Sequence, residues 1–233
     1  MTLRRFSVSN DNVTLYQFQT CPFCNRVKAY LDYNKLKYSV VEVNPLTKKE
    51  VKFSGSKSVP IATVGDKIIR DSANIIDHLR MSNPNDTLSF SPEDDEKWMT
   101  WSEKKLSVLL YPNITRTFGE SWQAFAYVGG VQSWSWIQRL SNRVLGPVAM
   151  FLVNGKIKKK YGIIDERAEL LTLLKEWTDA VGPNRYLHGD TVTLPDLMVF
   201  GVLRGINTMP TFDFIMSENQ QLKKWYDNVS AVM

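Results

Sequence analysis

Two cysteines three positions apart are the residues of this chain best suited to covalent chemistry. Cys21 and Cys24 are its only cysteines, and they stand in the segment Thr20-Cys-Pro-Phe-Cys24. Two thiols this close indicate a redox or nucleophilic pair in a reducing compartment, rather than a disulfide framework. A structural zinc site usually needs four ligands. With only two histidines in the chain, the sequence predicts no metal held by protein side chains.

The residues around the thiols predict a β-α-β unit that holds them. Residues 13–18 (VTLYQF) and 38–43 (YSVVEV) are rich in β-branched and aromatic residues, which favours strands. Pro22 fits the first turn of the helix between them. A thiol at a helix N-terminus is favoured as thiolate by the helix dipole and by free backbone N–H groups. Cys21 is therefore the expected nucleophile and Cys24 its supporting or resolving partner, whereas a pair of small core residues is the plainer alternative.

The rest of the chain divides into a mixed part and a helical part. Residues 47–53 predict a short helix, residues 61–64 and 67–70 a hairpin, and the segment from Ser72 a further helix. The polar stretch Met81–Ser91 predicts a linker. We therefore expect an α/β domain over residues 1–80, a linker over 81–91 and an all-helical domain over 92–233. In the second domain we expect helices from about residue 91 to a bend at Pro112, and over residues 134–160, 165–181, 193–205 and 218–232.

Charge and composition limit the classes of protein and partner. Apolar residues make up 43% and charged residues 23% of the chain, as in ordinary globular proteins. Residues 1–80 hold 13 basic and 7 acidic residues, whereas residues 81–233 hold 16 and 17. The net charge of +5 is too small to indicate a nucleic-acid partner. The basic first half is compatible with an anionic ligand, although from charge alone scattered solvated lysines are the favoured explanation. The longest apolar stretch, residues 144–153, is too short to span a bilayer, so we expect a soluble, cytoplasmic chain.

The sequence resembles two known families, one over its first part and one over its whole length. The first 80 residues resemble a glutaredoxin-type, thioredoxin-like domain, and the whole chain resembles a glutathione transferase with its all-α second domain. Residues 193–201 (TLPDLMVFG) resemble the start of a core helix in that second domain. The capping partners there are Thr193 and Asp196, and their expected role is structural.

The resemblance implies a glutathione site beside Cys21. In thioredoxin-like domains the proline matching Pro60 is cis and faces the active cysteine, and the residue before it, here Val59, offers backbone N–H and C=O groups to an extended peptide. The helix N-terminus at Ser72 suits a carboxylate, and Asp71 suits an ammonium group. Together they match the charges of the γ-glutamyl end of glutathione. A proline at the start of a strand and an ordinary helix cap are the alternatives.

More specifically, the chain resembles the type-2 membrane-associated prostaglandin E synthase family. The matching segments are residues 15–24 (LYQFQTCPFC), 40–45 (VVEVNP), 52–53 (KF), 59–61 (VPI), 71–72 (DS) and 201–204 (GVLR). The resemblance implies isomerisation of the prostaglandin H endoperoxide to prostaglandin E with bound glutathione, in a homodimer. It also implies haem whose iron is ligated by the glutathione thiolate. It further implies a longer precursor with an N-terminal anchor in a Golgi-type membrane, which this chain lacks.

Two positions depart from the family pattern. Well-known mammalian members carry a tyrosine where this chain has Phe18, which removes a hydroxyl placed to hydrogen-bond the catalytic thiol. In the helical domain Tyr111 replaces a serine, and we expect its hydroxyl to reach the pocket from the other side. With Phe23, Tyr111 is also our candidate for the pocket of an apolar co-substrate. Aromatic residues that either wall this cleft or pack in the core are Trp122, Phe125, Tyr127, Trp134 and Trp136.

The residues leave three functions open. The first is the glutathione-dependent isomerase. The second is a glutaredoxin-like or transferase-like thiol enzyme in which Cys21 forms a mixed disulfide with glutathione. The third is a non-enzymatic scaffold that binds glutathione or haem. The basic run Lys156–Lys160 fits a solvated helix end better than a contact with acidic lipid or nucleic acid.

Overall fold

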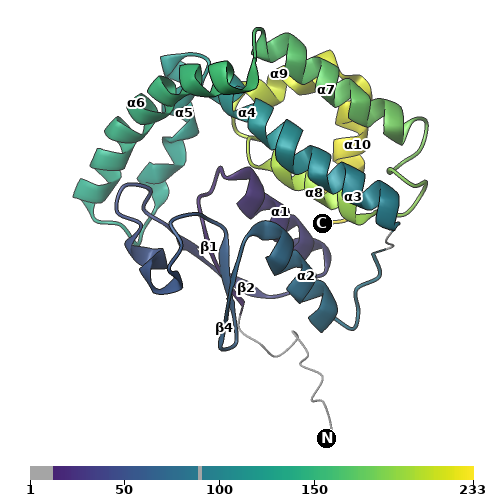
Figure 1. The fold of residues 1–233 in the computed structure, drawn as a ribbon, viewed down its shortest axis with the longest axis horizontal. Helices are drawn as coiled ribbons and strands as arrows, with labels where there is room; N and C mark the ends of the chain where they lie inside the picture. Colours follow the sequence, from purple (N-terminus) through teal and green to yellow (C-terminus); the bar gives the residue numbers. More distant parts are fainter. Residues whose placement is uncertain (1–12, 89–90) are drawn as a thin grey trace, which may run out of the picture.

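A four-stranded mixed sheet forms the first part of the fold in the computed structural model, which describes residues 13–88 and 91–233 (Figure 1). The strands β1 (Val13–Gln17), β2 (Tyr38–Glu42), β3 (Ile61–Val64) and β4 (Lys67–Arg70) lie in the order β2-β1-β3-β4. β1 and β2 are parallel, and the other neighbours are antiparallel. The parallel pair expected from the β-α-β pattern is therefore confirmed. Residues 1–12 of the first expected domain and residues 89–90 of the expected linker lie outside the described residues.

Helices and a short turn cover the sheet because each strand places apolar side chains on its inner face. The helices α1 (Pro22–Tyr33) and α2 (Ser72–Ser82) contribute Val27, Ile75 and Leu79 to the core that Leu15 of β1 also joins. A separate small cluster of Val43, Val51 and Ile61 anchors the 3-10 turn η2 (Lys49–Ser54). The two clusters fix the ends of β1 and β3, where the candidate site lies.

The second part of the fold is helical, as expected. α2 runs to Ser82, inside the segment expected as a linker, and α3 starts at Pro92. The helical elements are α3 (Pro92–Trp101), a π-helical turn η3 (Ser102–Leu106), α4 (Ser107–Ile114), α5 (Phe118–Ala124), the 3-10 turn η4 (Ala126–Gly130), α6 (Trp136–Tyr161), α7 (Glu166–Val181), α8 (Leu194–Arg204), α9 (Pro210–Glu218) and α10 (Gln220–Ser230). Within the described chain, no helix is both long and apolar enough to cross a membrane.

Two elements differ from the sequence-based expectation. The helix expected over residues 218–232 is preceded by α9, which begins at Pro210, and α10 follows after a break at Asn219. The Asn219 side chain accepts a hydrogen bond from Leu222 N at 2.9 Å and so caps α10. α5 was also not expected, because its seven residues carry too short a pattern to show periodicity.

The close packing of α1 against α8 joins the two parts. Gly201 of α8 is so near α1 that a Cβ atom there would lie 2.7 Å from the Cα atom of Arg26. The Arg26 side chain is fully buried and pairs with Glu103 at 3.1 Å, while Arg204 pairs with Asp32 at 2.7 Å. A small residue at 201 and two charge pairs thus hold the helical part against the thiol-bearing helix.

Candidate functional site

The two cysteines lie at the junction between β1 and α1. Cys21 is the N-cap residue of α1 and Pro22 opens the helix, as the sequence predicts. The loop is fixed by its backbone, since Cys21 N donates to Phe18 O at 3.0 Å and Asn25 N donates to Cys21 O at 3.0 Å. Cys21 is half-buried, whereas Cys24, one turn further along, is fully buried.

Hydrogen bonding makes the two thiols chemically unequal. The Cys24 thiol donates to the Cys21 sulfur, and the backbone N–H groups of Cys24 and Phe23 point to the same sulfur. The pKa of Cys21 is therefore lowered, chiefly by the Cys24 thiol and against the opposing effect of burial. Burial raises the pKa of Cys24 well above its usual range, and the Cys21 sulfur adds to that effect. Cys21 is thus the thiol that ionises first, and Cys24 remains a neutral donor beside it.

Phe18 contributes to the thiol pair through its backbone. Its N–H hydrogen-bonds the sulfur of Cys24, and its C=O accepts from Cys21 N. These contacts do not need a hydroxyl on the side chain. The Phe18 ring instead lines the cavity above the thiols, so the departure from tyrosine leaves the backbone support of the pair in place.

The expected glutathione-site residues form a second group at the ends of β3 and β4. The Val59–Pro60 peptide bond is cis, and the backbone N–H of Val59 makes no hydrogen bond to any part of the chain that the structure describes. Asp71 caps α2, where its carboxylate accepts from Ala73 N at 2.9 Å. Its φ of +74° lies in the left-handed region, which a non-glycine residue adopts at a cost. Ser72 Oγ is buried without a hydrogen-bond partner among the described residues.

An apolar cavity of about 360 Å³ lies over Cys21. Its walls come from both parts of the fold, because the loop before α1 faces α4, the α5–η4 turn and α6. The cavity includes the predicted pocket residues Phe23 and Tyr111, and of the aromatic candidates it includes Phe125 and Tyr127. The remaining candidates do not line this cavity. The Trp122 ring stacks against the guanidinium of Arg143, and Trp136 is exposed on α6. Trp134 is buried, and its indole N–H donates a hydrogen bond to the backbone carbonyl of Glu42. The lining residues are Phe18, Thr20, Cys21, Pro22, Phe23, Pro45, Ser107, Leu110, Tyr111, Ile114, Phe125, Tyr127, Met150 and Ile206.

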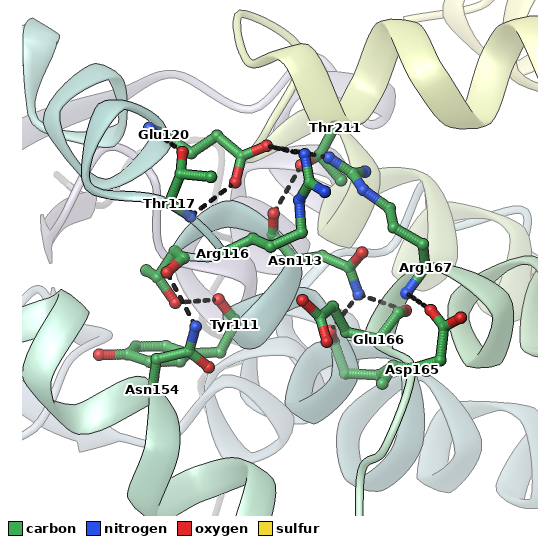
Figure 2. A network of polar contacts seen from close by, with 12 residues as sticks. Tyr111, Asn113, Arg116, Thr117, Glu120, Asn154, Asp165, Glu166, Arg167 and Thr211 are labelled. Atoms are coloured by element: carbon green, nitrogen blue, oxygen red, sulfur yellow. Dashed lines mark hydrogen bonds and ion pairs between the residues drawn. The ribbon is translucent and has the colours of Figure 1, made fainter.

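Tyr111 lies in the cavity wall, and its hydroxyl is already engaged. It donates to the backbone carbonyl of Met150 at 3.2 Å, and burial raises its pKa to about 12. The end of α4 is held by a polar network, in which Asn113 Nδ2 donates to Glu166 O at 2.8 Å and Thr211 Oγ1 donates to Asn113 O at 2.9 Å (Figure 2). Asn154 of α6 donates to Thr115 O at 2.8 Å in the same network. These bonds fix Tyr111 as a wall residue.

Tyr127 brings its hydroxyl toward the two thiols from the helical part of the fold. Its hydroxyl interacts with the carboxylate of Glu42 at the end of β2, and its pKa is raised by burial, by Glu42 and by the two cysteines. Glu42 also accepts from Gln19 N at 2.7 Å and Gln17 Nε2 at 3.1 Å. From the sequence, Tyr127 is expected either in the wall of the cleft or in the core, and Glu42 is not singled out. The one available signal was an acidic residue in an otherwise apolar strand.

The cavity does not fit haem. None of its lining residues is a lysine, arginine or histidine, so it offers no cation to the two propionates of haem. Throughout residues 13–88 and 91–233, no cluster of His, Cys, Asp and Glu side chains is arranged to hold a metal ion.

Known proteins resemble this chain in fold and in sequence. Residues 15–86 match the model described as Glutathione S-transferase, N-terminal domain, and residues 135–228 match Glutathione S-transferase, C-terminal domain. Among solved structures, glutathione S-transferase III in apo form aligns with a TM-score of 0.61 at 16% identity, over 94% of this chain and 92% of that one. A glutathione S-transferase from Rhodospirillum rubrum F11 aligns with a TM-score of 0.60 at 18% identity, over 92% and 86%. At these identities the solved structures establish the fold alone.

Two curated relatives are closer in sequence than these structures. Prostaglandin E synthase 2 of Danio rerio is 31% identical over 264 aligned positions, covering 93% of this chain and 70% of the relative. Prostaglandin E synthase 2 of Mus musculus is 30% identical over 263 positions, covering 92% and 68%. With identity at this level along nearly its whole length, the chain belongs to the prostaglandin E synthase 2 family, built on the glutathione S-transferase fold.

Proposed function

We propose that this protein is a glutathione-dependent isomerase that converts the prostaglandin H endoperoxide to prostaglandin E, with Cys21 as its nucleophile. The observation that carries the proposal is the Cys21 sulfur, whose ionised form is stabilised by Cys24 and by backbone N–H groups at the floor of an apolar cavity. An apolar cavity suits a fatty-acid-derived substrate. A thiolate within it is a strong nucleophile toward a weak O–O bond.

Glutathione is the proposed cofactor, bound at the second group of residues. The unpaired backbone N–H of Val59 and the buried, unpartnered Ser72 Oγ are polar groups that lack an intramolecular partner among the described residues. A peptide backbone on Val59 and a carboxylate at the N-terminus of α2 supply those partners. Asp71 adds a negative charge for the ammonium group, and its positive φ supports a functional role for this residue.

The chemistry balances without an outside oxidant or reductant. Attack of the thiolate on one endoperoxide oxygen forms an S–O bond while the O–O bond breaks, and the other oxygen leaves as an alkoxide that takes up a proton. Loss of the proton on the carbon that bears the sulfur-bound oxygen then forms the C=O bond and expels the thiolate. One ketone and one hydroxyl replace the endoperoxide, so the product is an isomer of the substrate. Cys24 acts by donating to the Cys21 sulfur and not by bonding to the substrate.

A thiol-disulfide oxidoreductase is the second candidate. The observation that favours it is that the Cys21 and Cys24 thiols, one helical turn apart, each shift the pKa of the other, so that Cys24 is placed to resolve a mixed disulfide between Cys21 and glutathione. In that reaction Cys24 replaces glutathione on Cys21, and glutathione leaves as a thiolate.

Single serine variants separate the candidates. For the isomerase we expect prostaglandin E from the endoperoxide to be lost in Cys21→Ser and retained in Cys24→Ser. For the oxidoreductase, reduction of a glutathione mixed disulfide depends on Cys21 and slows in Cys24→Ser. Full activity of both variants in both assays contradicts both candidates and favours a binding scaffold.

We further propose that the protein is a homodimer in which the partner subunit covers one face of α6. This face exposes large apolar side chains over about four turns, among them Ile137 at 59%, Leu145 at 52% and Leu152 at 67% exposure. Apolar patches of this extent usually mark an interaction surface. A second copy of the chain is the partner that the family resemblance supports.

A further inference from the structure

A second, polar cavity of about 540 Å³ lies next to the apolar one. Thr20 and Tyr127 line both cavities, so these two residues lie between them. The second cavity is enclosed by the start and middle of α1, the end of α5 and the turn after α8. Its lining residues are Gln19, Thr20, Asn25, Lys28, Gln123, Ala124, Ala126, Tyr127, Arg204, Gly205, Asn207, Thr208 and Met209.

Two cations and no carboxylate line this polar cavity. Arg204 is paired, since its Nη1 lies 2.7 Å from Asp32 Oδ2. Lys28 is half-buried, and it makes no hydrogen bond or ion pair with any residue in the described part of the chain. Burial and the nearby Arg204 both lower the pKa of Lys28, whereas Cys24, Glu42 and Asp32 act in the opposite direction. Lys28 is thus a cation held near another cation without a direct counterion.

The uncharged residues of the cavity add donors without internal partners. Gln19, Gln123, Asn207 and Thr208 are exposed at the rim of the cavity, and within the described residues no hydrogen bond engages their side-chain amides or hydroxyl. A half-buried charge is costly unless it is paired and hydrogen-bonded. An anion in the cavity would pair with Lys28, lessen its repulsion with Arg204 and accept hydrogen bonds from the amides.

We propose that this polar cavity is a binding site for a small oxyanion, a carboxylate or phosphate group, with Lys28 as its main partner and Arg204 as its second. The site is distinct from the proposed glutathione residues, which lie at β3, β4 and α2. It does not depend on the isomerase activity, so the two proposals can fail separately.

The polar cavity is also coupled electrostatically to the thiol pair. The charge of Lys28 lowers the pKa of Cys24, the donor to the Cys21 sulfur. An anion bound to Lys28 offsets that charge and keeps Cys24 more completely protonated. Occupancy of the polar cavity is therefore expected to affect the thiols without direct contact.

The test is titration of the purified full chain with inorganic phosphate and, separately, with succinate, at constant ionic strength set by chloride. Calorimetry and thermal unfolding report binding. We expect at least one of the two anions to bind and to raise Tm, and the stronger one identifies the oxyanion class. Lys28→Gln should weaken that binding at least tenfold, while Lys28→Arg should keep most of it.

The control is Lys223→Gln, which removes an exposed lysine already paired with Asp227 at 2.6 Å. It should bind the anion like the wild type. Lys28→Gln without anion should be at least as stable as the wild type, because it removes a half-buried charge that has no direct counterion. The proposal is overturned if neither anion binds, or if Lys28→Gln binds as tightly as the wild type while remaining folded.

Discussion

The hydroxyl of Tyr127 and the carboxylate of Glu42 interact beside the thiol pair, and each shifts the pKa of the other. Tyr127 lies in η4 of the helical part and Glu42 ends β2 of the sheet, so both parts of the fold build the surroundings of Cys21. Burial raises the pKa of Glu42, and its charge in turn raises the pKa of Cys21. Cys24 and Glu42 therefore act on Cys21 in opposite directions.

The Cys24 thiol should set the acidity of Cys21 through its hydrogen bond. In Cys24→Ser the donor is kept and in Cys24→Ala it is removed, and each variant leaves Cys21 as the single thiol. The rate of iodoacetamide alkylation rises with pH until the thiol is deprotonated. A bond to a charged acceptor is worth about 1.5 kcal/mol or more, so near neutral pH the alanine variant should react roughly tenfold more slowly than the serine variant. Identical pH profiles of the two variants would show that the hydrogen bond has no influence.

Removing the charge of Glu42 should make Cys21 more acidic. Glu42→Gln takes away a negative charge that opposes the thiolate, so the alkylation profile should move to lower pH. Asp66→Asn, in the turn between β3 and β4, removes one negative charge from the same sheet domain and should leave the profile in place. A shift of the Glu42→Gln profile to higher pH would contradict the inference that the Glu42 charge raises the pKa of Cys21.

The packing of α8 on α1 should not tolerate a side chain at residue 201. Gly201→Ala places a methyl group 2.7 Å from Asn25 O and Arg26 Cα, both of which are backbone atoms, so overpacking should cost about 1–3 kcal/mol of unfolding free energy. The matched control is Gly155→Ala in α6, where nothing lies within 4 Å, and there alanine should stabilise by about 1 kcal/mol. Urea unfolding of both variants measures the difference. Equal stabilities would mean that the two helices are less closely packed than described.

The apolar face of α6 should determine the oligomeric state. We expect light scattering to give twice the mass of one chain for the wild type, and the mass of one chain for Leu145→Glu with Leu152→Glu. Met81→Glu on α2 is the control, because Met81 is 89% exposed but lies outside this face. A wild-type protein that is monomeric at high concentration would exclude the proposed dimer.

Local patterns were sufficient to predict the sheet, the position of Cys21 and the helical second half. The strand at residues 61–64, the hairpin turn at Gly65 and the helix opened by Pro22 all follow from neighbouring residues. The Tyr127–Glu42 contact spans 85 positions and depends on how α1 packs against α8, so no local spacing reveals it. The polar cavity depends in the same way on Lys28 and Arg204, which come together only in the folded chain. Tyr111 lies in the cavity wall, but its hydroxyl donates to the backbone carbonyl of Met150, a contact across 39 positions that no local pattern indicates.

The decisive experiment is the initial rate of prostaglandin E formation from the endoperoxide, measured with glutathione for the wild type and for Cys21→Ser and corrected for spontaneous decay. If Cys21 is the nucleophile, the wild type forms prostaglandin E well above the protein-free rate, and Cys21→Ser falls to that rate while remaining folded. A wild-type rate equal to the protein-free rate, or a Cys21→Ser rate equal to that of the wild type, would contradict the proposed isomerase site.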